Sequence, residues 1–125
     1  MIQKRNFGEI WLANLNPPSG TEPGKTRPVL IVQNQVLLEV NHPSTLIVPL
    51  TTNLIQNAEP LRLRISPRGD LKQFSDLLID QLRAIDNKRL VKGPLAQCDL
   101  TFMKRVHQAI LDVIGCDIQD LRQED

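Results

Sequence analysis

Apolar residues occur along this chain in short runs that are separated by clusters of turn-forming residues. Four runs are rich in the large and β-branched side chains typical of strands, and we predict strands at 8–15, 27–33, 45–50 and 75–81. A fifth segment, LRLRI at 61–65, alternates apolar and basic residues with the period of two expected of a half-buried strand. This alternation places Leu61, Leu63 and Ile65 inward and directs outward Arg62 and Arg64.

Turn-forming residues close these segments at fairly regular intervals. Residues 16–20 read NPPSG and residues 66–70 read SPRGD. Pro28 has no N–H, so it belongs at the start of a strand or on a sheet edge. Residues 34–43 fit either a strand or a turn of helix. The repeated alternation of short strands and turns is typical of a small barrel or sandwich.

The last segment has a different period. Between residues 100 and 114, apolar residues lie three and four positions apart, as in an amphipathic helix, namely Leu100, Met103, Val106, Ile110, Val113 and Ile114. Asp99 is a suitable N-cap for this helix, and Gly115 is a suitable stop. We therefore predict a mainly β fold, a small and mostly antiparallel barrel with one C-terminal helix packed on it.

Composition limits the domain organisation and the cellular compartment. A chain of 125 residues, 41% hydrophobic and 23% charged, has the size and make-up of one globular domain, which we assign to residues 1–116, followed by an acidic tail at 117–125. No apolar run approaches the roughly 20 residues that span a bilayer, and no signal-peptide core is present, so we expect a cytoplasmic protein. Cys98 and Cys116 lack zinc-site spacing and are expected to be reduced thiols.

The charges are balanced overall but segregated along the chain, whose net charge is +1. Residues 62–72 carry four basic side chains and one acidic side chain, and so do residues 83–92. The tail at 117–125 carries four acidic side chains and one basic side chain. Such clustering is typical of a phosphate-binding face, although solvated charges on ordinary turns give the same pattern.

The segment most suggestive of chemistry is GTEPGKTRPVLIV at 20–32. It places a carboxylate, Glu22, and an arginine, Arg27, in a loop rich in glycine and proline that leads directly into an apolar strand. Functional loops are commonly held by a rigid scaffold in this way. This loop is therefore the first candidate site, and other segments must supply its partners.

Three segments of the chain resemble the MazF/PemK (Kid) toxins of bacterial toxin–antitoxin pairs. The run GEIWLANLNPPSGTEPGKTRPVLIVQN at 8–34 is similar to their N-terminal signature, a G-[DE]-[IV]-[WY] strand, a G-[ST]-E loop and an R-P-[VA]-[VL] strand. PLTT at 49–52 is similar to their second motif, and LLIDQLRAIDNKRL at 77–90 to a third. The three motifs follow one another in the order of the family.

This resemblance implies an SH3-like barrel that works as a homodimer and cleaves single-stranded mRNA without a metal or another cofactor. The expected products carry a 2′,3′-cyclic phosphate and a 5′-hydroxyl. A cognate antitoxin is the implied protein partner, with an acidic and partly disordered segment that would occupy the basic groove in which RNA binds. DNA would be reached only through the antitoxin. The two histidines and the lack of a carboxylate cluster with metal-ligand spacing agree with metal-independent chemistry.

The family pattern also implies roles for individual residues. Arg27 matches the arginine held to be catalytic, and Thr51 matches the threonine that contacts the scissile phosphate. A guanidinium suits a phosphate because it offers several donors in a fixed fork. Glu22 matches an acidic loop residue and would either act as general base or orient Arg27. Neighbouring residues expected to contact RNA are Lys25, Thr26 and Thr52.

The third motif contains Asp80 and Gln81, whose roles stay open between catalysis, base reading and structural hydrogen bonding. Leu78 stands where the PemK/Kid branch has an arginine held to take part in catalysis, so the chain sides with the arginine–threonine pair of the MazF branch. Aromatic residues are scarce and Trp11 is expected in the core, so stacking cannot be the main means of binding RNA. RNA would be held by basic side chains, of which the candidates are Arg62, Arg64, Arg68, Lys72 and Arg83.

Two other functions are compatible with a barrel of this size. A gyrase poison of the CcdB kind shares the fold, but its C-terminal Trp-Gly-Ile is replaced here by a chain that ends Arg-Gln-Glu-Asp. A barrel without catalytic activity that binds RNA or a peptide is the second alternative. The joint presence of Glu22, Arg27 and Thr51 argues against it.

Overall fold

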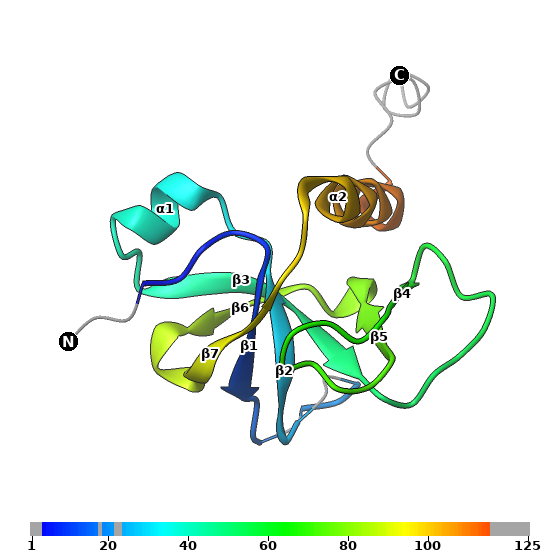
Figure 1. Cartoon of the computed structure of the whole chain (residues 1–125), viewed down its shortest axis with the longest axis horizontal. Coiled ribbons are helices and arrows are strands. Elements are labelled where there is room, and N and C mark those ends of the chain that lie inside the picture. The colour runs from blue at the N-terminus through cyan, green and yellow to red at the C-terminus, as the bar shows by residue number, and fades with distance from the viewer. Residues whose placement is uncertain (1–3, 18, 22–23, 116–125) are drawn as a thin grey trace.

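Seven strands form one antiparallel sheet in the computed structural model, which describes residues 4–17, 19–21 and 24–115 (Figure 1). The strands are β1 (Glu9–Asn14), β2 (Thr26–Ile31), β3 (Ser44–Thr51), β4 (Arg62–Ile65), β5 (Ser75–Leu78), β6 (Arg83–Asp86) and β7 (Leu90–Gln97). Their order is β4-β5-β3-β2-β1-β7, and β6 pairs with β3. The mainly β fold is therefore confirmed.

The sheet is not closed, so the word barrel applies only loosely. The strand pairings within the described residues leave β4 and β7 at the two ends of the order. The connection between β4 and β5 nevertheless reaches β7, because the amide of Asp70 donates to the carbonyl of Leu95 at 2.7 Å. This contact brings the β4–β5 connection next to the strand at the opposite end of the order.

The C-terminal helix α2 (Leu100–Ile114) begins and ends where its sequence predicts. The carboxylate of Asp99 accepts a hydrogen bond from the Phe102 amide at 2.8 Å, and Gly115 ends the helix in the left-handed conformation with φ of 73°. Its inward side is narrower than expected, since Leu100 and Ile114 are 66% and 63% exposed. The buried residues of the helix are Phe102, Met103, Val106 and Ala109.

The core has two parts because both faces of the central strands are buried. Ile10 and Leu30 belong to the cluster that packs under α2, whereas their neighbours Trp11 and Val29 belong to a second cluster. The second cluster includes Leu38 of the short helix α1 (Gln35–Glu39). Burial on both faces explains why these strands appear in the sequence as continuous apolar runs.

Several predicted element boundaries were wrong. The strand predicted at 75–81 ends at Leu78, and residues Ile79–Gln81 form the 3-10 turn η1. Residues 34–43, which fitted two assignments, contain α1, capped by the side chain of Asn34. Leu61 lies before β4 and is 51% exposed, so only Leu63 and Ile65 of that segment point inward. A second 3-10 turn, η2 (Asn87–Arg89), leads into β7, a strand that was not predicted.

Candidate active site

Two neighbouring inner strands bring Arg27 and Thr51 together, near the start of β2 and at the end of β3. Strands β2 and β3 are antiparallel, and Val29 pairs with Pro49. Continuing this register by two residues places Arg27 opposite Thr51, the last residue of β3. In agreement with this placement, the Nη1 atom of Arg27 donates to the carbonyl of Leu50 at 3.2 Å.

The Arg27 guanidinium is half-buried and fixed by backbone groups. Its Nε donates to the carbonyl of Gly24 at 2.9 Å, in addition to the bond from Nη1 to Leu50. These bonds use two of the five N–H donors of a guanidinium. Burial lowers the pKa of Arg27 below its ordinary value because the charged form loses hydration. A desolvated cation with donors left over is well suited to bind a phosphate.

The hydroxyl of Thr51 is held by the turn that follows β3. The amide of Asn53 donates to Thr51 Oγ1 at 3.2 Å. A hydroxyl has one donor hydrogen and two acceptor lone pairs, so this bond uses an acceptor and leaves the hydrogen to be donated. Thr51 can therefore donate a hydrogen bond at the same strand ends where Arg27 lies.

Both residues line an open groove of about 610 Å³. Lys25, Thr26 and Thr52, which were predicted to contact RNA, line it too. Its other walls come from the β4–β5 connection, with Lys72 and Gln73, from the first residue of β5, Ser75, and from β7, with Lys92. Among the described residues, four cations, Lys25, Arg27, Lys72 and Lys92, thus line the groove together with one acidic residue, Asp70. An excess of positive charge in a concave site is favourable for a polyanion.

The remaining basic candidates lie away from the groove lining. Arg62 and Arg64 form ion pairs with the buried Asp76 at 3.2 and 2.6 Å. Arg68 bonds to the carbonyl and hydroxyl of Ser66 at 3.1 Å each, and its guanidinium lies 5.0 Å from the centre of the Phe102 ring. These three arginines therefore have structural partners within the protein.

Residues of the third motif lie on other elements. Asp80 and Gln81 are on η1, which packs against α2, and Arg83 is on β6, where it pairs with Ile47 of β3. None of the three is among the groove-lining residues in the described part of the chain. Contact of these three residues with RNA thus stays a prediction. Glu22, Cys116 and the acidic tail at 117–125 lie outside the described residues, so their predicted roles also stay predictions.

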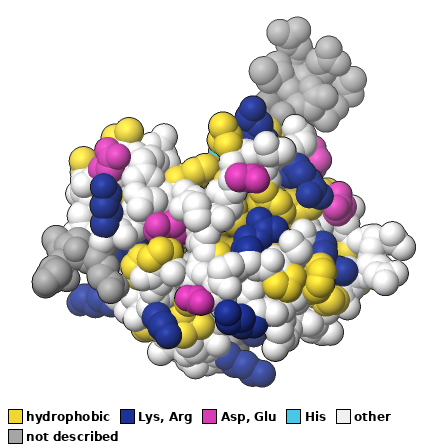
Figure 2. Space-filling model, in the orientation of Figure 1, with side chains coloured by type: hydrophobic (Ala, Val, Ile, Leu, Met, Phe, Trp, Pro, Cys, Tyr) yellow, Lys and Arg dark blue, Asp and Glu magenta, His cyan; other side chains and the backbone are white. Residues whose placement is uncertain are grey.

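Sequence reasoning missed Lys92, Gln73 and Ser75 as groove residues. Lys92 belonged to the basic segment 83–92, but its place in the site depends on the unpredicted strand β7 pairing with β1. On the face seen in Figure 2, Lys and Arg side chains are mixed with acidic and hydrophobic ones rather than covering it, as a net charge of +1 suggests.

The described residues were also compared with the requirements of a metal site, a membrane-spanning helix and a reactive thiol. The described residues contain no group of three or more His, Cys, Asp or Glu side chains that could hold a metal ion. No helix among them is both long and apolar enough to cross a bilayer. Cys98 is a free thiol, and burial raises its pKa, which keeps it in the unreactive protonated form.

Comparisons with known proteins agree on one family. Residues 6–114 match the family model described as "PemK-like, MazF-like toxin of type II toxin-antitoxin system". Endoribonuclease EndoA of Bacillus subtilis is 31% identical over 88% of this chain and 92% of its own length. Endoribonuclease MazF of Staphylococcus saprophyticus is 35% identical over 82% and 85% of the two chains. The crystal structure of MazF from Deinococcus radiodurans has the same fold, with a TM-score of 0.76, 18% identity, and coverage of 92% of this chain and all of that one.

Proposed function

The chain belongs to the PemK-like, MazF-like toxins of type II toxin–antitoxin systems, and from this premise we propose that it cleaves single-stranded RNA in the groove where Arg27 and Thr51 meet. It is an endoribonuclease, as its curated relatives are named. The alternative of a gyrase poison is not favoured. The observation that carries the proposal is the fixed guanidinium beside the oriented hydroxyl of Thr51.

The proposed reaction is attack of a ribose 2′-hydroxyl on the adjacent phosphate. The 2′-hydroxyl loses its proton to water as a bond forms between the 2′ oxygen and phosphorus. The bond to the 5′ oxygen breaks and that oxygen takes up a proton from water, which gives a 2′,3′-cyclic phosphate and a 5′-hydroxyl. Negative charge is spread over the equatorial phosphate oxygens in the transition state, and preorganised donors stabilise it. Arg27 supplies the charged donors and Thr51 supplies a neutral one, so the site needs no metal ion for this task.

Glu22, which lies outside the described residues, is the proposed partner of Arg27. A carboxylate is a weak base at neutral pH, so we assign Glu22 to orienting the guanidinium rather than to removing the 2′ proton. The cations Lys25, Lys72 and Lys92, with the hydroxyls of Thr26 and Thr52, would hold the flanking RNA backbone.

Partners and location follow from the same proposal. We propose that the toxin domain spans 1–116, that the chain forms a homodimer, and that it acts in the cytoplasm, where mRNA is translated. A cognate antitoxin would block the groove with an acidic segment, because such a segment reproduces the charge of RNA. The family description, which names type II toxin–antitoxin systems, supports an antitoxin as partner.

Substitutions in the groove test this function. Arg27→Ala and Thr51→Ala should each lower the rate of RNA cleavage by about 100-fold or more, because each removes a donor to the developing charge. The measurement is cleavage of a fluorescent single-stranded RNA by protein whose folding is verified by circular dichroism. Lys88→Ala removes an exposed cation of η2 outside the groove lining and is the matched control. Unchanged cleavage by folded Arg27→Ala and Thr51→Ala variants would overturn the assignment.

A further inference from the structure

Asp76, whose carboxylate is buried, is the residue opposite Thr51 on the neighbouring strand. The two residues pair in the antiparallel register of β3 and β5, and the Asp76 side chain is 1% exposed. Burying a carboxylate is costly unless it is paired. Here Oδ1 accepts from Arg64 Nε at 2.6 Å, and Oδ2 accepts from Arg62 Nη1 at 3.2 Å and from the amide of Ile55 at 2.9 Å.

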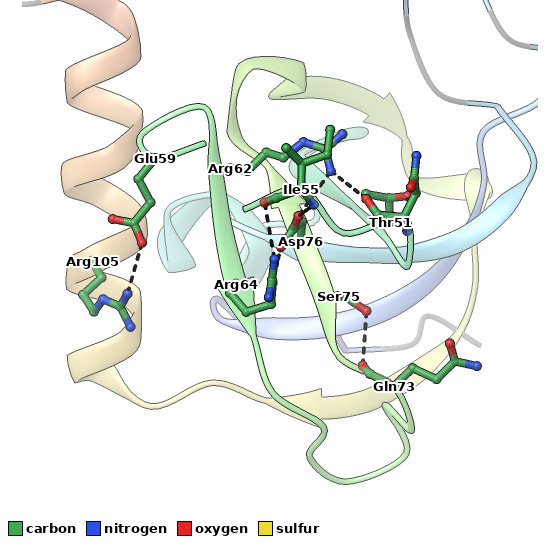
Figure 3. Close-up of polar contacts among 10 residues, drawn as sticks. Thr51, Ile55, Glu59, Arg62, Arg64, Gln73, Ser75, Asp76 and Arg105 are labelled. Carbon is green, nitrogen blue, oxygen red and sulfur yellow. Dashed lines mark hydrogen bonds and ion pairs between the residues drawn. The ribbon is translucent and has the colours of Figure 1, made fainter. Parts of the chain in front are cut away.

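This cluster is connected to the Thr51 hydroxyl by hydrogen bonds that meet at the backbone of Asn53. The Nη1 atom of Arg62, which binds Asp76, also donates to the carbonyl of Asn53 at 2.8 Å. The amide of the same Asn53 donates to Thr51 Oγ1. Figure 3 shows Asp76 between Arg62, Arg64 and Ile55, with Thr51 nearby. A displacement of Asp76 would therefore be transmitted to the groove.

The same cluster holds the loop that leaves β3. Residues 52–57 are exposed and bury little apolar surface, so polar tethers must determine where this loop lies. Asp76 binds the amide of Ile55, and Arg64 Nη2 donates to the carbonyl of Ile55 at 3.3 Å. Since Thr52 and Asn53 also line the groove, the loop forms part of the surface that RNA would touch.

We propose that Asp76 is a positioning residue for RNA cleavage, which fixes the Thr51 hydroxyl through Arg62 and Asn53 and fixes the groove-bordering loop through Ile55. In this arrangement, Arg62 and Arg64 act on RNA through the loop rather than by direct contact. The inference rests on the proposed function. It predicts that Asp76 controls both the rate of cleavage and the choice of RNA sequence.

The experiment compares wild type with Asp76→Asn, which keeps the shape of the side chain but removes its charge. We expect kcat to fall by about tenfold or more with KM changed by less than about threefold, because small misplacements of reacting groups lower the rate strongly. Mapping of 5′ ends on a long RNA should show additional cleavage sequences. Cleavage with the wild-type kcat at the wild-type sites by folded Asp76→Asn would refute the proposal.

A second variant covers the case in which Asp76→Asn does not fold. Arg62→Leu removes the tether to Asn53 but leaves Arg64 on Asp76, so the same fall in kcat and change of cleavage sites are expected. If Arg62 instead contacted RNA directly, KM would rise with kcat unchanged, and the proposal would be wrong.

Two controls separate positioning from general destabilisation. Glu59→Gln removes a carboxylate from the same β3–β4 connection, beyond the loop at 52–57, but its ion pair with Arg105 is exposed, at 3.7 Å, so cleavage should not change. Ile85→Val weakens the other core cluster and should lower thermal stability without changing kcat or the sites cut. If these two variants altered the cleavage sites as Asp76→Asn does, positioning by Asp76 would be refuted. If the wild-type protein cut no RNA, the proposed function itself would fail, and this inference with it.

Discussion

Arg27 is held in position by the protein backbone before any substrate arrives. Its bonds to the carbonyls of Gly24 and Leu50 fix the plane of the guanidinium, and partial burial removes competing water. Preorganised charge of this kind accelerates a reaction because no reorganisation is needed in the transition state. At the residue scale, the groove thus provides a fixed charged donor and, at Thr51, a fixed neutral one.

Acid should weaken the residue-scale cluster around Asp76. Burial alone would raise the pKa of Asp76, but hydrogen bonds from Arg64, the Ile55 amide and Arg62 hold that pKa below its ordinary value. A carboxyl with a lower pKa in the folded state stabilises the protein fully above its unfolded pKa of about 3.9, and this stabilisation is lost as the pH falls through the folded pKa. Among the described residues, the charged groups that face Asp76 are those of Arg62 and Arg64.

The measurement is urea unfolding of wild type and Asp76→Asn between pH 7 and pH 2. We expect wild type to be the more stable at pH 7 and the difference to narrow below about pH 4, as Asp76 itself becomes neutral. A difference that stays constant down to pH 2 would show that the charge of Asp76 does not stabilise the fold.

At the element scale, the sequence predicts those elements whose local signals agree with their packing. Asp99 and Gly115 delimit α2 because capping is a local interaction. The β7 strand could not be predicted in this way, since Gly93 and Pro94 interrupt its pattern. The glycine at position 93 is explained by tertiary packing. A Cβ there would collide with the ring of Trp11, so glycine lets β7 pack on β1.

The same distinction applies to the candidate site. Arg27 and Thr51 are predicted from motifs close to strand ends, whereas the role of Asp76 depends on its pairing with β3 and β4 and is invisible in the local sequence. The alternation in LRLRI correctly separates Arg62 and Arg64 from the buried Leu63 and Ile65, but only the fold shows that the partner of both arginines is Asp76. A buried ionic cluster is specified by contacts distant in sequence.

Removal of the N-cap of α2 should destabilise the protein moderately. Asp99→Ala leaves the Phe102 amide without its side-chain partner, which costs about 1 kcal/mol of unfolding free energy. Asp112→Ala is the matched control in the same helix, since it removes only an exposed bond to Gln108, worth about 0.2–0.5 kcal/mol. Chemical denaturation of both variants at pH 7 checks this order, and equal losses would contradict the capping role.

At the scale of the whole molecule, the nearly neutral chain concentrates positive charge in the groove, which strands and their connections line together. Lys25 precedes β2, Lys72 lies in the β4–β5 connection and Lys92 lies on β7, and the open sheet brings all three to one groove. Binding of RNA there would release counterions from the phosphates, so affinity should fall with salt. The fold, rather than the net charge, thus creates the proposed RNA-binding surface.

Salt dependence measures the contribution of each cation. Lys92→Gln should reduce the slope of log affinity against log salt by about 0.7, the value for one phosphate contact to a single strand, while Lys88→Gln should leave the slope unchanged. Binding is measured with the Arg27→Ala variant, so that the RNA is not consumed during titration. Equal slopes for both lysine variants would remove Lys92 from the RNA-binding surface.

The most direct test of the central claim is the chemistry of the RNA ends produced by the purified protein in the presence of EDTA. A long single-stranded RNA is incubated with wild type and with Arg27→Ala, and its ends are mapped and analysed. The proposed function predicts cleavage by wild type at specific sites, with 2′,3′-cyclic phosphate and 5′-hydroxyl ends, and cleavage by Arg27→Ala that is slower by about 100-fold or more. Loss of wild-type cleavage in EDTA, or products with 5′-phosphate ends, would contradict it.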